Sequence, residues 1–192
     1  MTEESFGQQS WERRWEDDLR THAGALADRP PNADLVAVAS GLAPGRALDA
    51  GCGHGAESLW LARAGWTVTA VDFSRTALDI GRASGVEGID WVEGDLGVWV
   101  PELAAYDLVV CLYVHVAGSA TEMVARLASG VAPGGTLLLV GHVDAPGQQQ
   151  VGLADAQAVL TAPLWDLRVA EERARDHGVA GTDAVVRAVR VG

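Results

Sequence analysis

The chain of 192 residues contains no lysine. Its 14 basic residues are all arginines, and they stand against 26 acidic residues, which gives a formal net charge of −12. An acidic surface without a basic cluster does not attract a phosphate backbone or an anionic membrane surface. We therefore expect neither a nucleic-acid substrate nor a membrane partner.

The chain also lacks an apolar N-terminal segment and any run of 18 apolar residues. We therefore expect neither a signal peptide nor a transmembrane helix. Only two cysteines are present, Cys52 and Cys111. They are too few for a disulfide scaffold, and two thiols alone provide too few ligands for a metal site. We expect a cytoplasmic protein with two free thiols and no metal.

The length and the hydrophobic content of 48% suit one packed domain. We predict a single domain over residues 1–192, with an N-terminal helical cap over 1–44 and an α/β core over 45–192. A two-domain dehydrogenase does not fit this length.

One stretch organises the chain. Residues 47–50 form a short apolar run that ends in the glycine cluster 51–55, and an amphipathic segment follows from Ala56. A β-branched run over 67–71 then closes on an acid, Asp72. Strand, glycine loop, helix, strand and carboxylate, in this order, are typical of a βαβ unit that binds a nucleotide-like ligand.

The residue types in this stretch suit the binding of a nucleotide-like ligand. Glycines allow unusual backbone angles and let a ligand approach the main chain closely. The helix from Ala56 directs free N–H groups at the ligand. Asp72 can accept both hydroxyls of a ribose. The string Gly51-x-Gly53-x-x-Ala56 also satisfies the dinucleotide pattern, so an NAD(P)-dependent oxidoreductase is an alternative at this point.

Asp49, two residues before a Gly-x-Gly-x-Gly loop, resembles motif I of the class I S-adenosylmethionine-dependent methyltransferases. In that family the acid and the loop hold the methionine end of the cofactor. The resemblance implies a Rossmann-like three-layer α/β sandwich, whose seven-stranded, mostly parallel sheet ends in a C-terminal antiparallel pair. It also implies a set of cofactor-binding residues in this stretch: Asp49, Gly51, Cys52, Gly53, His54, Gly55, Asp72, Phe73 and Ser74.

Later segments extend the resemblance. Gly94-Asp95-Leu96 follows an expected strand over 89–93, where the family contacts adenine. The apolar strand expected over 106–112 resembles motif IV, which would place Cys111 and Leu112 beside the cofactor. An Ala-Pro-Gly-Gly turn over 132–135, before a strand over 136–142, is frequent in these methyltransferases and has no reason to occur in nicotinamide enzymes. It therefore favours S-adenosylmethionine as cofactor.

The N-terminal helix expected from Ser10 carries Trp11 and Trp15 on one face. Two interpretations are open: a helix docked on the core by two indoles, or a lid over the ligand. A Trp-x-x-x-Trp pair in this place resembles the thiopurine- and tellurite-type small-molecule methyltransferases, where the segment helps to cover the cofactor.

Sequence patterns predict the remaining elements. Helices are expected over 33–41, 74–84, 119–131 and 153–160. Strands with one solvated face are expected over 165–172 and 184–191, because apolar and polar residues alternate there.

Methyl transfer from a sulfonium is an in-line displacement that needs a general base only when the acceptor must lose a proton. His115 lies just past the expected strand 106–112 and is the candidate base; a purely structural role in the loop is the alternative. Tyr113, His115 and His142 are candidates for the acceptor pocket. The compact core favours a small-molecule acceptor, with S-adenosyl-L-homocysteine as the other product. A non-catalytic module that binds S-adenosylmethionine is a further alternative, and the sequence does not indicate an oligomeric state.

Overall fold

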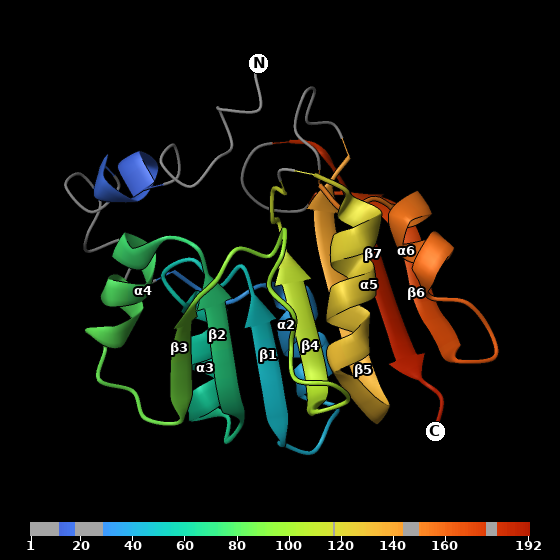
Figure 1. Ribbon diagram of the computed structural model, residues 1–192, viewed down its shortest axis with the longest axis horizontal. Helices are drawn as coiled ribbons and strands as arrows, with labels where there is room; N and C mark the ends of the chain where they lie inside the picture. The colour runs from blue at the N-terminus through green and yellow to red at the C-terminus, as the bar shows by residue number, and fades with distance from the viewer. Residues whose placement is uncertain (1–11, 18–28, 117, 144–149, 176–179) are drawn as a thin grey trace. The chain divides into compact units, whose positions relative to one another are not determined.

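The computed structural model (Figure 1) describes residues 12–17, 29–116, 118–143, 150–175 and 180–192. The chain forms two compact units, residues 1–95 and residues 96–192. The strands follow the order β3-β2-β1-β4-β5-β7-β6 of a seven-stranded sheet. The predicted single-domain organisation stays a prediction.

The first unit alternates helices and parallel strands. The pairing of β1 with β2 and of β2 with β3 is parallel, with Ala50 opposite Val71 and Asp72 opposite Glu93. Helix α3 packs on β2 and also contacts β1 and β3, while α4 packs on β3 and β2. The elements are α2 (Ala33–Ala39), β1 (Arg46–Ala50), α3 (Ala56–Arg63), β2 (Thr67–Asp72), α4 (Arg75–Arg82) and β3 (Ile89–Glu93).

Polar side chains fix where two of these helices begin. The Asn32 side chain accepts hydrogen bonds from the backbone N–H groups of Asp34 and Leu35 at the start of α2. The Ser74 hydroxyl accepts from the N–H of Ala77 at 3.1 Å, which confirms the predicted start of α4. These caps satisfy N–H groups that the helix itself leaves unpaired.

The indole of Trp91 on β3 packs against two glycines. A Cβ added at Gly55, the residue before α3, would lie 2.3 Å from the indole, and a Cβ added at Gly81 in α4 would lie equally close, at 2.3 Å. Gly55 also adopts a left-handed φ of +88°. The absence of side chains at both positions therefore lets one aromatic ring contact the start of α3 and the last turn of α4.

The second unit holds four strands and two helices. The pairing of β4 with β5 is parallel, and β7 pairs antiparallel with both β5 and β6, which confirms the predicted C-terminal antiparallel pair. Figure 1 shows α5 and α6 side by side over one face of these strands. The elements are β4 (Tyr106–Leu112), α5 (Ala120–Gly130), β5 (Val131–His142), α6 (Leu153–Val159), β6 (Trp165–Ala174) and β7 (Thr182–Arg190).

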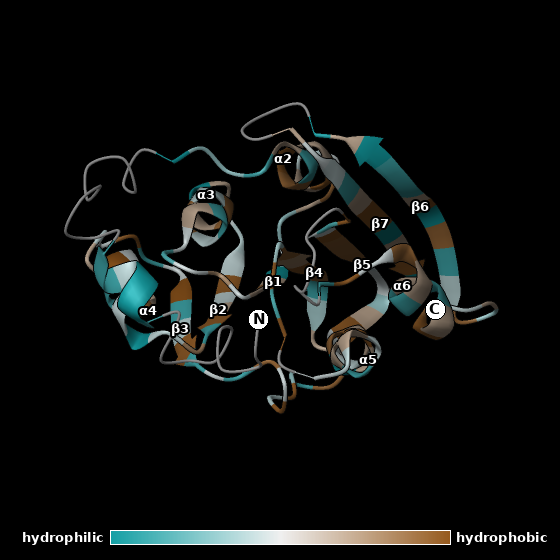
Figure 2. Cartoon of the chain, turned by 90° about the horizontal axis from the view of Figure 1, so that it is seen from above, coloured by the Kyte–Doolittle hydropathy of each residue, from teal (hydrophilic) through white to brown (hydrophobic). Residues whose placement is uncertain are grey.

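Two predictions about this unit were wrong in detail. The turn expected over 132–135 lies inside β5: Val131 already pairs with Tyr106, and residues 132–135 form an irregularity before Thr136 pairs with Leu108. Strand β7 was expected to have one solvated face, yet the residues over 183–186 are all buried. The reason is that β7 lies between β5 and β6 and contacts α6. Figure 2 shows the contrast between the hydrophobic β5 and the largely hydrophilic edge strand β6.

None of the helices in the described ranges is long and apolar enough to cross a membrane.

The packing of Trp91 leads to a test by substitution. Alanine in a helix is usually favoured over glycine by about 1 kcal/mol. At position 81 we expect Gly81→Ala instead to lower the free energy of unfolding by about 1–2 kcal/mol, because the new methyl group would overlap the indole. Urea unfolding followed by circular dichroism measures the change.

The control is the same substitution in a Trp91→Leu background, which removes the overlapping atoms. There Gly81→Ala should be neutral or stabilising. Stabilisation by Gly81→Ala with Trp91 in place would contradict this account of the packing.

Candidate functional site

The glycine loop after β1 is fixed by backbone hydrogen bonds. The N–H groups of Gly51 and Cys52 both donate to the carbonyl oxygen of Val71 on β2, at 2.7 and 3.0 Å. Gly53 and Gly55 have left-handed φ values of +54° and +88°, which other residues adopt only at a cost. The loop is therefore fixed against β2 in a backbone conformation that requires glycine.

Asp72, at the end of β2, joins the glycine loop to α4. Its Oδ2 accepts from the N–H of Gly53 at 2.9 Å, and its Oδ1 accepts from the N–H of Ser74 at 2.9 Å. Burial raises the pKa of the Asp72 carboxyl, although these two N–H groups work in the opposite direction. Because an ionised carboxylate can accept about four hydrogen bonds, Asp72 keeps acceptor capacity for hydroxyl groups of a ligand.

Asp49 lies inside β1, 3% exposed, and faces the first turn of α3. Its Oδ2 accepts from the Ser58 hydroxyl at 2.6 Å, and the backbone N–H of Ser58 also donates to it. Burial, with help from the nearby Glu57 charge, raises the pKa of Asp49 to about 7. A group with such a pKa can change its charge state at neutral pH when a cation binds next to it.

The helical segment 12–17 contacts both the glycine loop and α4. Glu12 accepts a hydrogen bond from the N–H of Arg75 at 2.7 Å, in the first turn of α4. The Trp15 indole lies against Gly53, where an added Cβ would come within 2.9 Å of it, and its ring centroid is 5.5 Å from that of the buried His54. Trp15 thus covers part of the loop. Trp11, the other predicted indole, lies outside the described residues.

The other predicted cofactor residues fall on both units. In the first unit Phe73 is half-buried, and Gly94 donates its N–H to the carbonyl oxygen of Asp72 at 3.0 Å, with an exposed Asp95 next to it. In the second unit Leu96 is buried and Leu112 half-buried.

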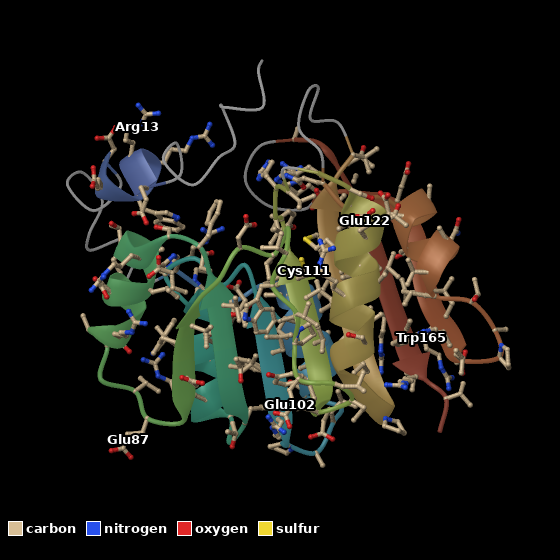
Figure 3. All side chains as sticks on the ribbon, viewed as in Figure 1. Arg13, Glu87, Glu102, Cys111, Glu122 and Trp165 are labelled. Carbon is tan, nitrogen blue, oxygen red and sulfur yellow. The ribbon has the colours of Figure 1, made fainter. Side chains whose placement is uncertain are left out.

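Both cysteines are buried free thiols, which agrees with the prediction. Burial raises the pKa of Cys52 well above its usual value, and the charges of Asp49 and Asp72 add to this effect. Cys111 lies near the carboxyl end of β4, as Figure 3 shows. Within the described ranges, no group of three or more His, Cys, Asp or Glu side chains could hold a metal ion.

Polar side chains of the second unit gather around Asp183. The Tyr113 hydroxyl donates to its Oδ2 at 2.9 Å, and Nδ1 of His142 lies 2.9 Å from its Oδ1. Nε and Nη2 of Arg175 donate to Oδ1 at 3.1 and 2.8 Å. Desolvation alone would raise the pKa of Asp183, but the hydrogen bonds from Arg175, His142 and Tyr113 outweigh it and lower the pKa. We call these four residues the Asp183 cluster.

His115 lies beside this cluster through Gln150. The Gln150 Oε1 accepts the backbone N–H of His142, so its amide nitrogen must face Nε2 of His115, 2.7 Å away. An amide nitrogen only donates, and Nε2 of His115 therefore accepts. Of the predicted acceptor residues, Tyr113 and His142 meet directly, with ring centroids 4.5 Å apart, and Gln150 connects His115 to them.

Sequence reasoning missed several residues that hold these groups. Ser58 binds Asp49 in β1, and Glu12 binds the first turn of α4. Arg175, Asp183 and Gln150 hold the polar side chains of the second unit together. Only Asp183 left a usable signal: an acid next to the apolar run of β7 resembles Asp72 at the end of β2. The contacts of the other residues join separate segments of the chain, and no local sequence pattern indicates them.

Two family models match the chain. The one described as "Methyltransferase domain" matches residues 47–135, and the one described as "Thiopurine S-methyltransferase (TPMT)" matches residues 6–84. The second match covers the N-terminal segment in which the tryptophan pair was noted.

Curated relatives match a larger part of the chain. A ubiquinone biosynthesis O-methyltransferase from Xanthomonas oryzae pv. oryzae (strain PXO99A) is 31% identical over 132 residues, 66% of this chain and 55% of that protein. Ribosomal RNA small subunit methyltransferase C from Alcanivorax borkumensis is 33% identical over 136 residues, 66% of this chain and 41% of that protein. The chain thus spans about half the length of the curated relatives it matches.

Solved structures show the same fold. Magnesium protoporphyrin IX methyltransferase from Synechocystis PCC 6803 with bound SAH superposes with a TM-score of 0.68 at 22% identity, over 98% of this chain and 97% of that one. TehB from Haemophilus influenzae gives a TM-score of 0.70 at 16% identity, over 94% and 67%. These likenesses confirm the predicted Rossmann-like α/β fold class.

The raised pKa of Asp49 predicts a pH dependence of stability. A carboxyl whose pKa rises from 3.8 to about 7 on folding holds its proton more tightly in the folded chain. Its contribution is therefore fully present below about pH 4 and is lost as the pH rises toward 7, by an amount on the order of 3 kcal/mol. Urea unfolding of the ligand-free protein between pH 4.5 and 7.5 should show this decline.

Asp49→Asn should flatten most of the decline, because the amide cannot ionise and can still accept from Ser58. A residual slope of the same sign is expected from Asp72, whose pKa is also raised. The exposed Asp90→Asn is the matched control and should leave the slope unchanged. An unaltered slope in Asp49→Asn would refute the assignment.

Proposed function

The chain belongs to the class I S-adenosylmethionine-dependent methyltransferases, and from this premise we propose that it transfers the methyl group of S-adenosylmethionine to a small-molecule acceptor. The observation that carries the proposal is the Asp72 carboxylate, which holds the glycine loop through Gly53 and keeps acceptor capacity. A ribose presents two adjacent hydroxyls, which suit a carboxylate fixed in this way.

We assign different residues to different parts of the cofactor. The glycine loop and Asp49 receive the methionine end, where the ionised form of Asp49 attracts the positive amino group. Asp72 receives the ribose hydroxyls, and Asp95 with Leu96 receives the adenine. Trp15 lies over Gly53 and covers the bound cofactor, and its indole face suits a sulfonium cation.

S-adenosylmethionine supplies an electrophilic methyl group with its leaving group attached. The protein has to hold the acceptor in line with that methyl group and keep water out. Tyr113, His115 and His142 lie at or just beyond the carboxyl ends of β4 and β5, and in this fold type ligands bind at the carboxyl ends of the strands. These three side chains are therefore assigned to the acceptor.

A small-molecule acceptor agrees with the charge of the chain. One relative is named a ribosomal RNA methyltransferase, but a protein that grips RNA needs basic side chains for the phosphates. This chain has a net charge of −12 and no lysine. Another relative is named a ubiquinone biosynthesis O-methyltransferase, which makes phenols a reasonable first class of acceptor to test.

Calorimetric titration with S-adenosylmethionine, S-adenosylhomocysteine and NADH tests the cofactor assignment. We expect micromolar-range binding of the first two and none of NADH. Asp72→Ala should weaken the binding of both adenosyl ligands by at least tenfold, because the variant loses the ribose acceptor and the bond to the Gly53 N–H. Asp90→Ala, which removes an exposed acid from β3, is the matched control.

Binding of NADH alone would overturn the proposal in favour of an oxidoreductase. If both adenosyl ligands bind, radiolabelled methyl transfer to a panel of phenols, thiols, amines and metalloid oxyanions measures the activity. Tight binding without transfer to any member would favour the non-catalytic module.

A further inference from the structure

The geometry of the Asp183 cluster points to His142 as the general base of the reaction, with Asp183 as the residue that positions it. The acceptor would then be a group with an acidic proton, such as a phenol or a thiol. This inference rests on the proposed function and narrows its acceptor class. His142 ends β5, and Asp183 is its direct partner in the antiparallel pairing of β5 with β7.

Asp183 is built to stay ionised and to accept hydrogen bonds. Its side chain is 6% exposed, and the Arg175 guanidinium pairs with it. The Tyr113 hydroxyl approaches the other oxygen. An ionised carboxylate can only accept, so the 2.9 Å contact to Nδ1 of His142 is a hydrogen bond when that nitrogen carries a hydrogen.

Arg175 competes for the same nitrogen. Its Nη2 lies 2.6 Å from Nδ1 of His142, and a guanidinium cannot accept a hydrogen bond. Nδ1 can therefore either donate to Asp183 or accept from Arg175. Two nitrogens of Arg175, Nε and Nη2, already donate to the Asp183 carboxylate. Nη2 carries two hydrogens, so its bond to Asp183 does not by itself exclude a second bond to Nδ1. An unprotonated Nδ1 would, however, place its lone pair 2.9 Å from an ionised carboxylate oxygen, and we therefore infer that the hydrogen lies on Nδ1 and is directed at Asp183.

With the hydrogen on Nδ1, Nε2 of neutral His142 carries a lone pair. Within the part of the chain that the structure describes, Nε2 makes no hydrogen bond, and the side chain is 28% exposed. His115 differs, because the amide of Gln150 occupies its Nε2. Of the two histidines, His142 is thus the one whose Nε2 lone pair has no hydrogen-bond donor among the described residues, while a base role for His115 stays a prediction.

Tyr113, the residue that follows β4, supports this arrangement. It has a left-handed φ of +58°, unusual for a residue with a side chain. Its ring contacts the His142 imidazole at a tilt of 33°, and its hydroxyl donates to Asp183. Among the described residues, the charged or titratable groups that contact His142 are Tyr113, Arg175 and Asp183.

The acceptor O–H or S–H gives its proton to Nε2 of His142, and the oxygen or sulfur uses its electron pair to bond the methyl carbon. The bond between that carbon and the sulfonium sulfur breaks, and its electrons remain on sulfur, which leaves a neutral thioether. The imidazolium later releases its proton to solvent. Asp183 stabilises the imidazolium that forms.

Long-range ¹H–¹⁵N NMR of histidine-labelled protein reads the tautomer directly and needs neither cofactor nor turnover. The signals of His142 among the five histidines are assigned by their loss in His142→Gln. At a pH where the imidazole is neutral, we expect the Nδ1–H form in the unmodified protein. Asp183→Asn should move the population toward the Nε2–H form, in which Nδ1 accepts from Arg175.

Two further variants keep the test decisive if Asp183→Asn fails to fold. Arg175→Met removes the competing donor and should retain Nδ1–H, and Tyr113→Phe deletes only the hydroxyl and should leave the tautomer unchanged. A predominance of Nε2–H in the unmodified protein would overturn the inference. So would Nε2–H in Arg175→Met, or an unchanged tautomer in a folded Asp183→Asn.

Measurements of turnover are a second test of the role of His142. With a phenol or thiol acceptor, His142→Gln should lower kcat by 10²–10⁴-fold while S-adenosylmethionine binds as before. Asp183→Asn should lower kcat and move the acid limb of the pH–rate profile to lower pH, a shift that a merely structural role would not produce. Equal phenol or thiol turnover by His142→Gln would overturn the inference. Failure of S-adenosylmethionine to bind the unmodified protein would instead refute the proposed function and leave the NMR result standing.

Discussion

The Asp72 carboxylate binds two backbone N–H groups, one from the glycine loop and one from the start of α4. Without these bonds the N–H of Ser74, on a residue that is fully buried, would lose its acceptor, and an unsatisfied buried donor costs about 1–3 kcal/mol. The left-handed shape of Gly53 and the capping position of Ser74 both depend on this one side chain. The arrangement of the glycine loop and the start of α4 is therefore fixed by contacts within the chain itself.

The two units differ in how the negative charge of a buried carboxylate is compensated. Asp72 is surrounded by neutral N–H donors, and burial raises its pKa. Asp183 has a guanidinium in direct contact, and its pKa is lowered. The charge of Asp183 is thus compensated within the chain, whereas Asp72 and Asp49 leave negative charge to be compensated by whatever binds next to them. Asp183 organises neighbouring side chains, whereas the ionised form of Asp49 would attract a positively charged group bound next to it.

The sequence was sufficient to predict the elements that depend on local patterns. The sequence predicted the order of strands and helices from β1 to β4, the start of α4 next to Ser74 and the antiparallel C-terminal pair. What it could not reveal depends on contacts between distant segments. Nothing near Ser58 indicates that its hydroxyl binds Asp49. Asp183 fell outside the strand expected over 184–191, because the apolar pattern of β7 begins only at the next residue. The irregularity in β5 likewise followed from pairing with β4 rather than from the residues at 132–135 themselves.

The packing of Trp91 between Gly55 and Gly81 has a consequence for the evolution of the family. The Trp91 indole occupies the space that a side chain at position 55 or position 81 would need. Position 55 belongs to the glycine loop, where ligand binding alone would otherwise explain the need for glycine. Homologues that place a smaller residue at the position of Trp91 gain room for a side chain at the position of Gly81, while the left-handed backbone still requires glycine at position 55. Positions 81 and 91 should consequently covary in an alignment, and position 55 should remain invariant for two independent reasons.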